Sequence, residues 1–125
     1  MKKQIVIVDD FENTRWIIQQ SLSKENYNIL LASNGKEALE YFDGREIDLL
    51  ITDYNMPELN GIELIKKVKE DKQYEFLPII LLTTERNAEK LKAAENVKVT
   101  TIVNKPFEVN SFRKIVNKCV NQYVR

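Results

Sequence analysis

Three acidic side chains and one lysine stand at the ends of apolar runs in this chain. The run IVIVDD ends at Asp9 and Asp10, LLITD ends at Asp53, and TTIVNK ends at Lys105. Runs of this length that are rich in Val and Ile predict buried strands of a parallel sheet, and ligands of such sheets bind at the carboxyl ends of the strands. Three carboxylates brought together repel one another unless a cation neutralises them. The sequence therefore predicts a magnesium site that contains a nucleophile.

Each of these residues also has a simpler explanation when it is taken alone. An Asp pair after a strand can be the N-terminal cap of the following helix, but Asp53 ends a different strand, where nothing local requires an acid. Lys105 precedes Pro106, which restricts the backbone and so aims the lysine. Thr83 ends the fourth apolar run and offers a hydroxyl at the same sheet edge. The constellation is more specific than any of its members.

The composition excludes several classes of function. The 125 residues are 43% hydrophobic and 30% charged, as in an ordinary globular domain. Lys and Arg number 19 and so do Asp and Glu, so there is no basic excess of the kind that binds nucleic acid or anionic membranes. The absence of histidine excludes Ser-His and Cys-His catalysis. A single cysteine, Cys119, no signal peptide and no long apolar stretch favour a cytoplasmic protein with Cys119 in a helix core.

Strand-like and helix-like segments alternate from end to end. The expected strands are residues 4–9, 28–32, 48–53, 78–83 and 99–104, and the expected helices are about 12–25, 35–43, 60–71, 85–96 and 108–123. Apolar residues at helical spacing predict the buried stripes of the first and last helices: Thr14, Ile17, Ile18, Leu22, Val109, Phe112, Val116, Cys119 and Tyr123. Five βα units with short connections predict an α/β domain, a doubly wound parallel sheet with helices on both faces. No linker or repeat interrupts residues 1–125, so we expect one domain.

At this point the sequence resembles the receiver domain of two-component response regulators, in particular single-domain receivers of the chemotaxis-regulator (CheY-like) type. The matching stretches are IVIVDDFENTR, LLITDYNMPELNGIELIKKVK, PIILLTTE and VNKPF, in the order and spacing of that family. The resemblance covers the whole chain. It implies a flavodoxin-like sheet of five strands in the order 2-1-3-4-5 with five helices.

The resemblance also implies a role for each of the clustered residues. Asp53 would be the phosphoacceptor and a further Mg²⁺ ligand, Asp10 would bind Mg²⁺ directly, and Asp9 would bind it chiefly through water. The backbone carbonyl of Asn55 would complete the protein's share of the coordination, which suits an ion that keeps several waters. Lys105 and Mg²⁺ would offset the charge of the phosphoryl oxygens.

In this family the phosphoryl donor is a phosphohistidine of a sensor histidine kinase, and phosphorylation changes the surface of the fourth helix, fifth strand and fifth helix. Thr83 would move inward to bind the phosphoryl group and draw the following loop with it. Asn55 and Glu85 occupy positions that influence how water reaches the acyl phosphate, which predicts a fairly short-lived phosphoryl state. The alternative for both is a solvated loop residue.

Two features depart from the family pattern. The family has Tyr or Phe at the switch position three residues before the lysine, whereas this chain has Ile102, whose side chain is stiff and has no hydroxyl. We expect the aromatic switch to be absent and segment 84–96 to carry the output, the alternative being that Ile102 packs against the last helix. The segment ENVKVTT also lacks a glycine to end the fourth helix, and Asn96 is the expected substitute.

Other classes fit less well. A phosphatase of the haloacid dehalogenase type needs a DxD arrangement and a cap domain, and a flavodoxin-like electron carrier needs a hydroxyl- and glycine-rich phosphate loop. A receiver that signals by binding alone would not need the acids, Thr83 and Lys105. The receiver is expected to be a monomer, with dimerisation on phosphorylation left open, and not to be an enzyme acting on other substrates. Its output is either a downstream protein partner or a phosphotransfer protein, because we expect no effector domain to follow residue 125.

Overall fold

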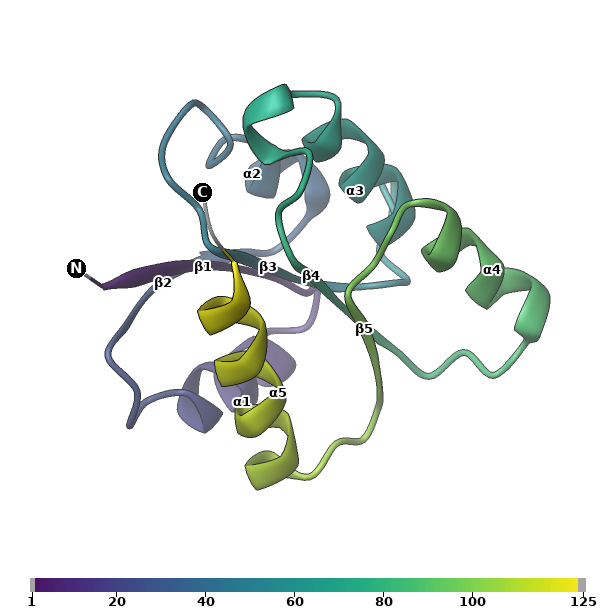
Figure 1. Ribbon diagram of the computed structural model, residues 1–125. Coiled ribbons are helices and arrows are strands. Elements are labelled where there is room, and N and C mark those ends of the chain that lie inside the picture. Colours follow the sequence, from purple (N-terminus) through teal and green to yellow (C-terminus); the bar gives the residue numbers. More distant parts are fainter. Residues whose placement is uncertain (1, 124–125) are drawn as a thin grey trace.

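The computed structural model describes residues 2–123, in which strands alternate with helices (Figure 1). The strands are β1 (Lys3–Val8), β2 (Tyr27–Ala32), β3 (Leu49–Asp53), β4 (Ile79–Thr83) and β5 (Thr101–Asn104). The helices are α1 (Glu12–Ser21), α2 (Gly35–Leu39), α3 (Gly61–Lys69), α4 (Ala88–Asn96) and α5 (Val109–Gln122), and a 3-10 helix, η1 (Lys72–Tyr74), precedes β4. Within the described residues, none of these helices combines the length and apolar character needed to cross a membrane.

The five strands form one parallel sheet in the order β2-β1-β3-β4-β5, which confirms the predicted topology. Every residue of β3 and β4 is buried, as expected for interior strands that helices cover on both faces. Asp53 pairs with Leu82, and Thr83 pairs with Asn104. The register therefore brings the carboxyl ends of β3, β4 and β5 to the same edge of the sheet.

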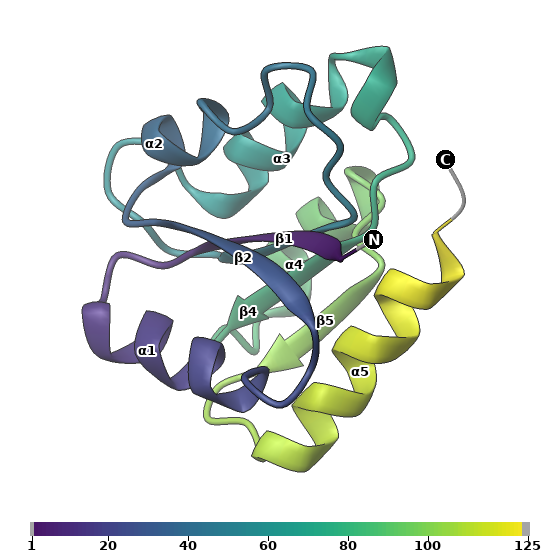
Figure 2. The same ribbon diagram turned by 90° about the vertical axis from the view of Figure 1, so that its left-hand side faces the viewer.

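Helices lie on both faces of this sheet, which Figure 1 shows edge-on, with α2 and α3 above it and α1 and α5 below it; Figure 2 shows the same layers from the side. Successive strand residues point to opposite faces, so Leu50 packs in the cluster under α2, α3 and α4, and Ile51 packs in the cluster under α1 and α5. Cys119 belongs to the second cluster, as predicted, and its burial raises the pKa of the thiol.

The predicted helical stripes are wrong at three positions. Tyr123 lies beyond Gln122, the last residue of α5, and its partly buried side chain packs in the cluster on the opposite face of the sheet from Phe112. The other two positions are Ile17 and Val109. These two side chains are 45% and 43% exposed, whereas Ile18, Leu22 and Phe112 are buried. A helix turns by about 100° per residue, so Ile18 and Leu22 occupy the buried face and Ile17 is rotated away from it. The apolar residues at positions 17 and 109 therefore lie on the surface.

Three helices are clearly shorter than predicted. α2 ends at Leu39 rather than near residue 43, since the amides of Glu40, Tyr41 and Phe42 donate to carbonyls three residues back. The amides of Leu22 and Ser23 donate to carbonyls three residues back, so α1 ends at Ser21 in a tight turn rather than near residue 25. The fourth helix begins at Ala88 rather than at 85, because the Glu85 carboxylate accepts hydrogen bonds from the amides of the next two residues. Such local side-chain bonds compete with helical ones.

The end of α4 corrects the prediction about Asn96. Asn96 is the last helical residue, and Lys98 instead adopts the left-handed conformation, with φ of 58°. The amide of Lys98 donates to Glu95 and the amide of Val99 donates to Ala94. This pair of bonds is the Schellman arrangement, which places its left-handed residue two positions beyond the last helical residue.

Ile102 does not pack as the alternative interpretation expected. Its partly buried side chain joins the cluster on the α2, α3 and α4 face of the sheet, together with Ala94 and Val97, whereas Phe112 and Val116 of α5 belong to the other cluster. Ile102 therefore packs on the α4 side of the sheet rather than on the α5 side.

Candidate functional site

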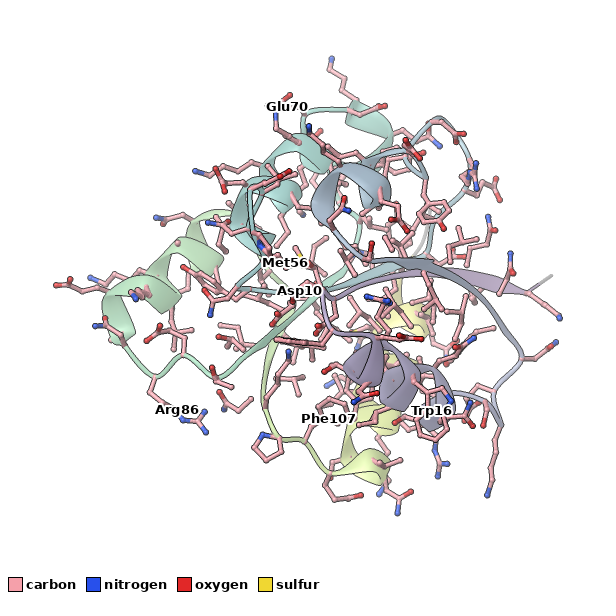
Figure 3. All side chains as sticks on the ribbon, turned by 180° about the vertical axis from the view of Figure 1, so that it is seen from behind. Asp10, Trp16, Met56, Glu70, Arg86 and Phe107 are labelled. Carbon is pink, nitrogen blue, oxygen red and sulfur yellow. The ribbon has the colours of Figure 1, made fainter. Side chains whose placement is uncertain are left out.

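The residues predicted to carry chemistry converge at the carboxyl edge of the sheet. Asp53 is the last residue of β3, and Asp9 and Asp10 directly follow β1, its neighbour in the sheet. Figure 3 shows Asp10 near the middle of the molecule, between the helices that cover the two faces of the sheet. One carboxylate oxygen from each of the three acids lies within 4.8 Å of the other two.

Lys105 bridges two of these acids. Its Nζ lies 2.9 Å from Asp9 Oδ2 and 3.0 Å from Asp53 Oδ1. The lysine is brought there by its backbone, because the Lys105 amide donates to the Thr83 carbonyl at 2.9 Å and so continues the β4–β5 ladder by one residue. The cis peptide bond between Lys105 and Pro106 follows directly. One ammonium group thus bridges two of the three carboxylates, those of Asp9 and Asp53.

The charges of the cluster influence one another. Burial raises the pKa of the Asp53 carboxyl, the hydrogen bond from Lys105 lowers it, and repulsion from Asp9 and Asp10 raises it, so that the net direction is upward. Burial opposes the charge of Lys105, yet its bonds to Asp9 and Asp53 raise its pKa above the ordinary value. The net upward shift at Asp53 means that Lys105 does not fully offset burial and the neighbouring acids.

Asp10 provides the test of whether the cluster suits a divalent cation. Asp9 uses both of its oxygens, since Oδ1 accepts from the Phe11 amide at 2.9 Å and Oδ2 accepts from Lys105. Among the described side chains, Asp10 Oδ1 is the buried polar atom that has no hydrogen-bond partner. A buried oxygen without a partner is costly. Together with two further carboxylates it offers the hard oxygen ligands that Mg²⁺ prefers, so the residues present fit this ion.

Thr83 is fully buried at the end of β4, and its hydroxyl is already engaged. Its Oγ1 accepts a hydrogen bond from the Glu85 amide at 2.8 Å. Glu85 in turn lies 3.5 Å from the ammonium group of Lys90 in α4. A change in the position of the Thr83 hydroxyl therefore affects the loop that leads into α4.

The remaining predicted residues lie at the margin of the site. Asn55 is exposed in the loop after Asp53, two residues from the cluster. Ile102 lies on β5, paired with Leu81 of β4, and not at the sheet edge where Lys105 meets the acids.

Two residues that sequence reasoning missed position the cluster. Arg15 donates from Nη1 to the Asp9 carbonyl at 2.6 Å and so ties the β1–α1 turn to α1. A Cβ added to Gly61 would lie 2.3 Å from the Asp53 carbonyl oxygen, so only glycine permits α3 to start this close to β3. Both residues occur in the stretches that resemble the receiver family, which was the available signal.

A mainly apolar hollow of about 400 Å³ adjoins Lys105. It is lined by Thr14, Ile17, Thr84, Lys105, Pro106 and Phe107. The exposed side chains of Phe11 and Ile17 belong to the same β1–α1 region. The approach to the acidic cluster is thus bordered by apolar surface from α1 and from the loop after β5.

Comparisons with known proteins agree with this arrangement. A family model described as "Response regulator receiver domain" matches residues 5–117. The chain is 40% identical over 106 residues to the chemotaxis protein CheY1 of Helicobacter pylori, covering 83% of this chain and 86% of that protein. It is 31% identical over 116 residues to the chemotaxis protein CheY-3 of Vibrio cholerae, covering 92% of this chain and 89% of that protein.

Solved structures agree in fold. The chemotaxis response regulator CheY4 of Vibrio cholerae superposes with a TM-score of 0.88 and 32% sequence identity, covering 95% of this chain and 99% of that chain. The similarity therefore extends over the whole sheet that positions the acids and Lys105.

Proposed function

The chain belongs to the response regulator receiver domain family, and from this membership we propose that it is a phosphorylation-dependent switch whose acceptor is Asp53. The observation that carries the proposal is the convergence of three carboxylates within 4.8 Å with Lys105, which lies 3.0 Å from Asp53. A nucleophilic carboxylate among cation-binding acids and a lysine is the arrangement that phosphoryl transfer to aspartate requires. Residues 1–125 would act as one receiver domain.

In the proposed reaction an oxygen of Asp53 attacks the phosphorus of a phosphohistidine. The phosphorus–nitrogen bond breaks, the electron pair leaves with the imidazole of the donor, and an acyl phosphate forms on Asp53. Lys105 holds a positive charge beside the incoming phosphoryl oxygens. When bound, Mg²⁺ would offset the negative charge that develops on the phosphoryl group. Asp10 would hold the ion directly, Asp9 through water and Asn55 through its carbonyl, and Asp53 would be a further ligand.

The new phosphoryl group adds about 1.5–2 negative charges and three acceptor oxygens. Thr83 carries the hydroxyl able to donate to one of them, because its oxygen only accepts a bond from the Glu85 amide. The proposed inward movement of Thr83 would draw its oxygen away from that amide. Glu85 and Asn55 flank the acceptor and would govern the access of water, so that the phosphoryl state is short-lived. Loss of the Thr83–Glu85 bond would free the start of α4 and change the α4, β5 and α5 surface.

Ile102 carries a separate hypothesis within this function. Because its side chain packs on the α4 side and has no hydroxyl, we infer that segment 84–96 conveys the signal without an aromatic switch. Replacing Ile102 with Tyr should leave phosphorylation-induced chemical shift changes and partner affinity unchanged. A large gain in coupling would mean that this position still takes part in the switch.

The proposed partners follow from the chemistry. The donor would be a sensor histidine kinase, as in the family, and the lack of histidine in this chain fits the acceptor role. The reaction would take place in the cytoplasm. The output would be a downstream protein or a phosphotransfer protein that binds the changed surface, and the chain would catalyse only its own phosphorylation and dephosphorylation.

Intact mass after incubation with phosphoramidate, with and without Mg²⁺, tests the proposal. We expect one phosphoryl adduct that requires Mg²⁺ and is absent from Asp53→Asn. An adduct that persists in Asp53→Asn would mean that another residue is the acceptor. No adduct in the wild-type chain would leave a receiver fold that signals by binding alone.

A further inference from the structure

Tyr54, the residue after the proposed acceptor, is anchored on two sides through its backbone. Its amide donates to the Leu82 carbonyl of β4 at 2.9 Å, and its carbonyl accepts from the Gly61 amide of α3 at 2.8 Å. Its main chain therefore cannot shift without disturbing β4 and the start of α3. The side chain of Tyr54 is thus held on a rigid base.

The side chain of Tyr54 reaches α4. Its hydroxyl donates to the backbone carbonyl of Lys90 at 3.1 Å, and its ring packs in the cluster that contains Ala94 and Val97 at the end of α4. Ile102, in the same cluster, is purely apolar and can form no such bond. Tyr54, which directly follows β3, therefore provides an aromatic hydroxyl that bonds α4 on this face of the sheet.

Apolar burial holds α4 only weakly. Of its residues, all of them described, Ala94 alone is buried, whereas α3 buries five: Gly61, Ile62, Leu64, Ile65 and Val68. Because Ala has a small side chain, its burial contributes little. A single hydrogen bond is therefore a large share of what keeps α4 in place.

A second contact meets α4 at the same residue. The ammonium group of Lys90 lies 3.5 Å from Glu85 Oε2, and the Glu85 amide is bonded to the Thr83 hydroxyl at 2.8 Å. The backbone carbonyl of Lys90 is thus bonded to Tyr54, which follows β3. Its side chain is paired with Glu85, which follows β4. If Thr83 moves toward a phosphoryl group, the Glu85–Lys90 pair loses its link to β4, whereas the Tyr54 bond is unaffected.

We propose that Tyr54 is a positioning residue whose hydroxyl holds α4 in the packing of the unphosphorylated chain and so sets how readily phosphorylation releases this helix. The proposal rests on the proposed function, in which Asp53 receives the phosphoryl group. Since coupling between two sites is reciprocal, whatever loosens α4 also favours phosphorylation at Asp53.

Amide hydrogen exchange of the unphosphorylated chain tests the hold directly. Tyr54→Phe removes the hydroxyl and keeps the ring, and Tyr41→Phe is the matched control, because the Tyr41 hydroxyl donates to the Leu31 carbonyl at 2.7 Å, away from α4. We expect exchange in residues 88–97 to rise roughly two- to tenfold in Tyr54→Phe and to stay at the wild-type rate in Tyr41→Phe. Equal rates in all three proteins, or a rise in Tyr54→Phe spread evenly over the chain, would overturn the proposal.

Phosphorylation tests the coupling. At sub-saturating phosphoramidate with Mg²⁺, the ratio of phosphorylated to unphosphorylated protein should rise in Tyr54→Phe and should not rise in Tyr41→Phe. An unchanged ratio beside faster α4 exchange would overturn the coupling. If no variant, nor the wild type, takes up a phosphoryl group, the proposed function fails, while the exchange rates still decide whether Tyr54 holds α4.

Discussion

The ammonium nitrogen of Lys105 lies 3.0 Å from Asp53 Oδ1, and the same nitrogen lies 2.9 Å from Asp9 Oδ2. The lysine side chain is 18% exposed, so water screens this charge only in part. A single cation is therefore shared between the proposed acceptor and an acid of the proposed Mg²⁺ site.

Replacing Lys105 with Met should slow phosphorylation of Asp53 by roughly 100-fold, because the charge that faces the incoming phosphoryl oxygens is lost. The initial rate of adduct formation with phosphoramidate measures this effect. Lys114→Met on the exposed side of α5 is the control and should keep the wild-type rate. A Lys105→Met rate within about twofold of wild type would contradict the role of this lysine.

Asp10→Asn should have opposite effects on stability without Mg²⁺ and on Mg²⁺ binding. Without the ion, one charge of a repelling cluster disappears, so the free energy of unfolding should rise by about 1 kcal/mol. The additional stability that Mg²⁺ confers on the wild type should be lost. Urea unfolding with and without Mg²⁺ measures both, with Glu70→Gln, far from the cluster (Figure 3), as control. Full Mg²⁺ stabilisation of Asp10→Asn would argue against direct coordination.

Gly61→Ala should destabilise the fold by about 2–3 kcal/mol, because its Cβ would meet the backbone oxygen of Asp53 at 2.3 Å and neither backbone can move freely. Gly35→Ala is the control. Its Cβ would meet the Leu59 side chain, at 2.6 Å from Cδ2 and 3.0 Å from Cβ, and no backbone atom, so we expect a smaller cost of about 1 kcal/mol. Thermal unfolding of both variants decides whether the close approach of α3 to β3 is as restrictive as the geometry indicates.

Lys98→Gly should stabilise the chain by about 1 kcal/mol, since glycine adopts the left-handed conformation without the steric cost that Lys98 bears at φ of 58°. Lys92→Gly, in the interior of α4, should instead destabilise it by about 1 kcal/mol. The denaturant concentration at the midpoint of unfolding compares the stability of the two variants, provided that the dependence of the free energy of unfolding on denaturant is the same in both. If both variants lost stability, another interaction of Lys98 would have to outweigh its backbone strain.

Tyr27 should titrate in the folded chain with a pKa of about 12, raised by burial and by the negative charge of Glu25. The folded state then holds its proton to higher pH than the unfolded state does, so this contribution to stability is complete below pH 10 and is lost as the pH rises toward 12. The ultraviolet titration difference between wild type and Tyr27→Phe isolates this group. Ionisation near pH 10 would contradict the expected burial.

The strands and their parallel arrangement could be predicted because each strand has a local sequence signal, whereas the strand order followed from the resemblance to the receiver family. The β3 and β4 segments are unbroken apolar runs, and Asn60 with Glu63 forms the reciprocal cap from which α3 begins. The ends of the helices were less predictable, since the start of α4 depends on the Glu85 carboxylate and its end depends on Lys98 rather than on Asn96. Where a helix begins or ends depends on individual side-chain and backbone hydrogen bonds, and several neighbouring residues could form them.

The sequence by itself determined the residue types at the strand ends, and with them the chemistry: three acids, a hydroxyl and a lysine that parallel strands must bring to one edge. The tertiary structure decided how those groups share their bonds. Asp9 is satisfied by Lys105 and the Phe11 amide, while Asp10 keeps a buried oxygen without a partner. It also decided that Tyr54 bonds α4, because a contact between distant segments depends on the packing of whole helices and not on any local pattern.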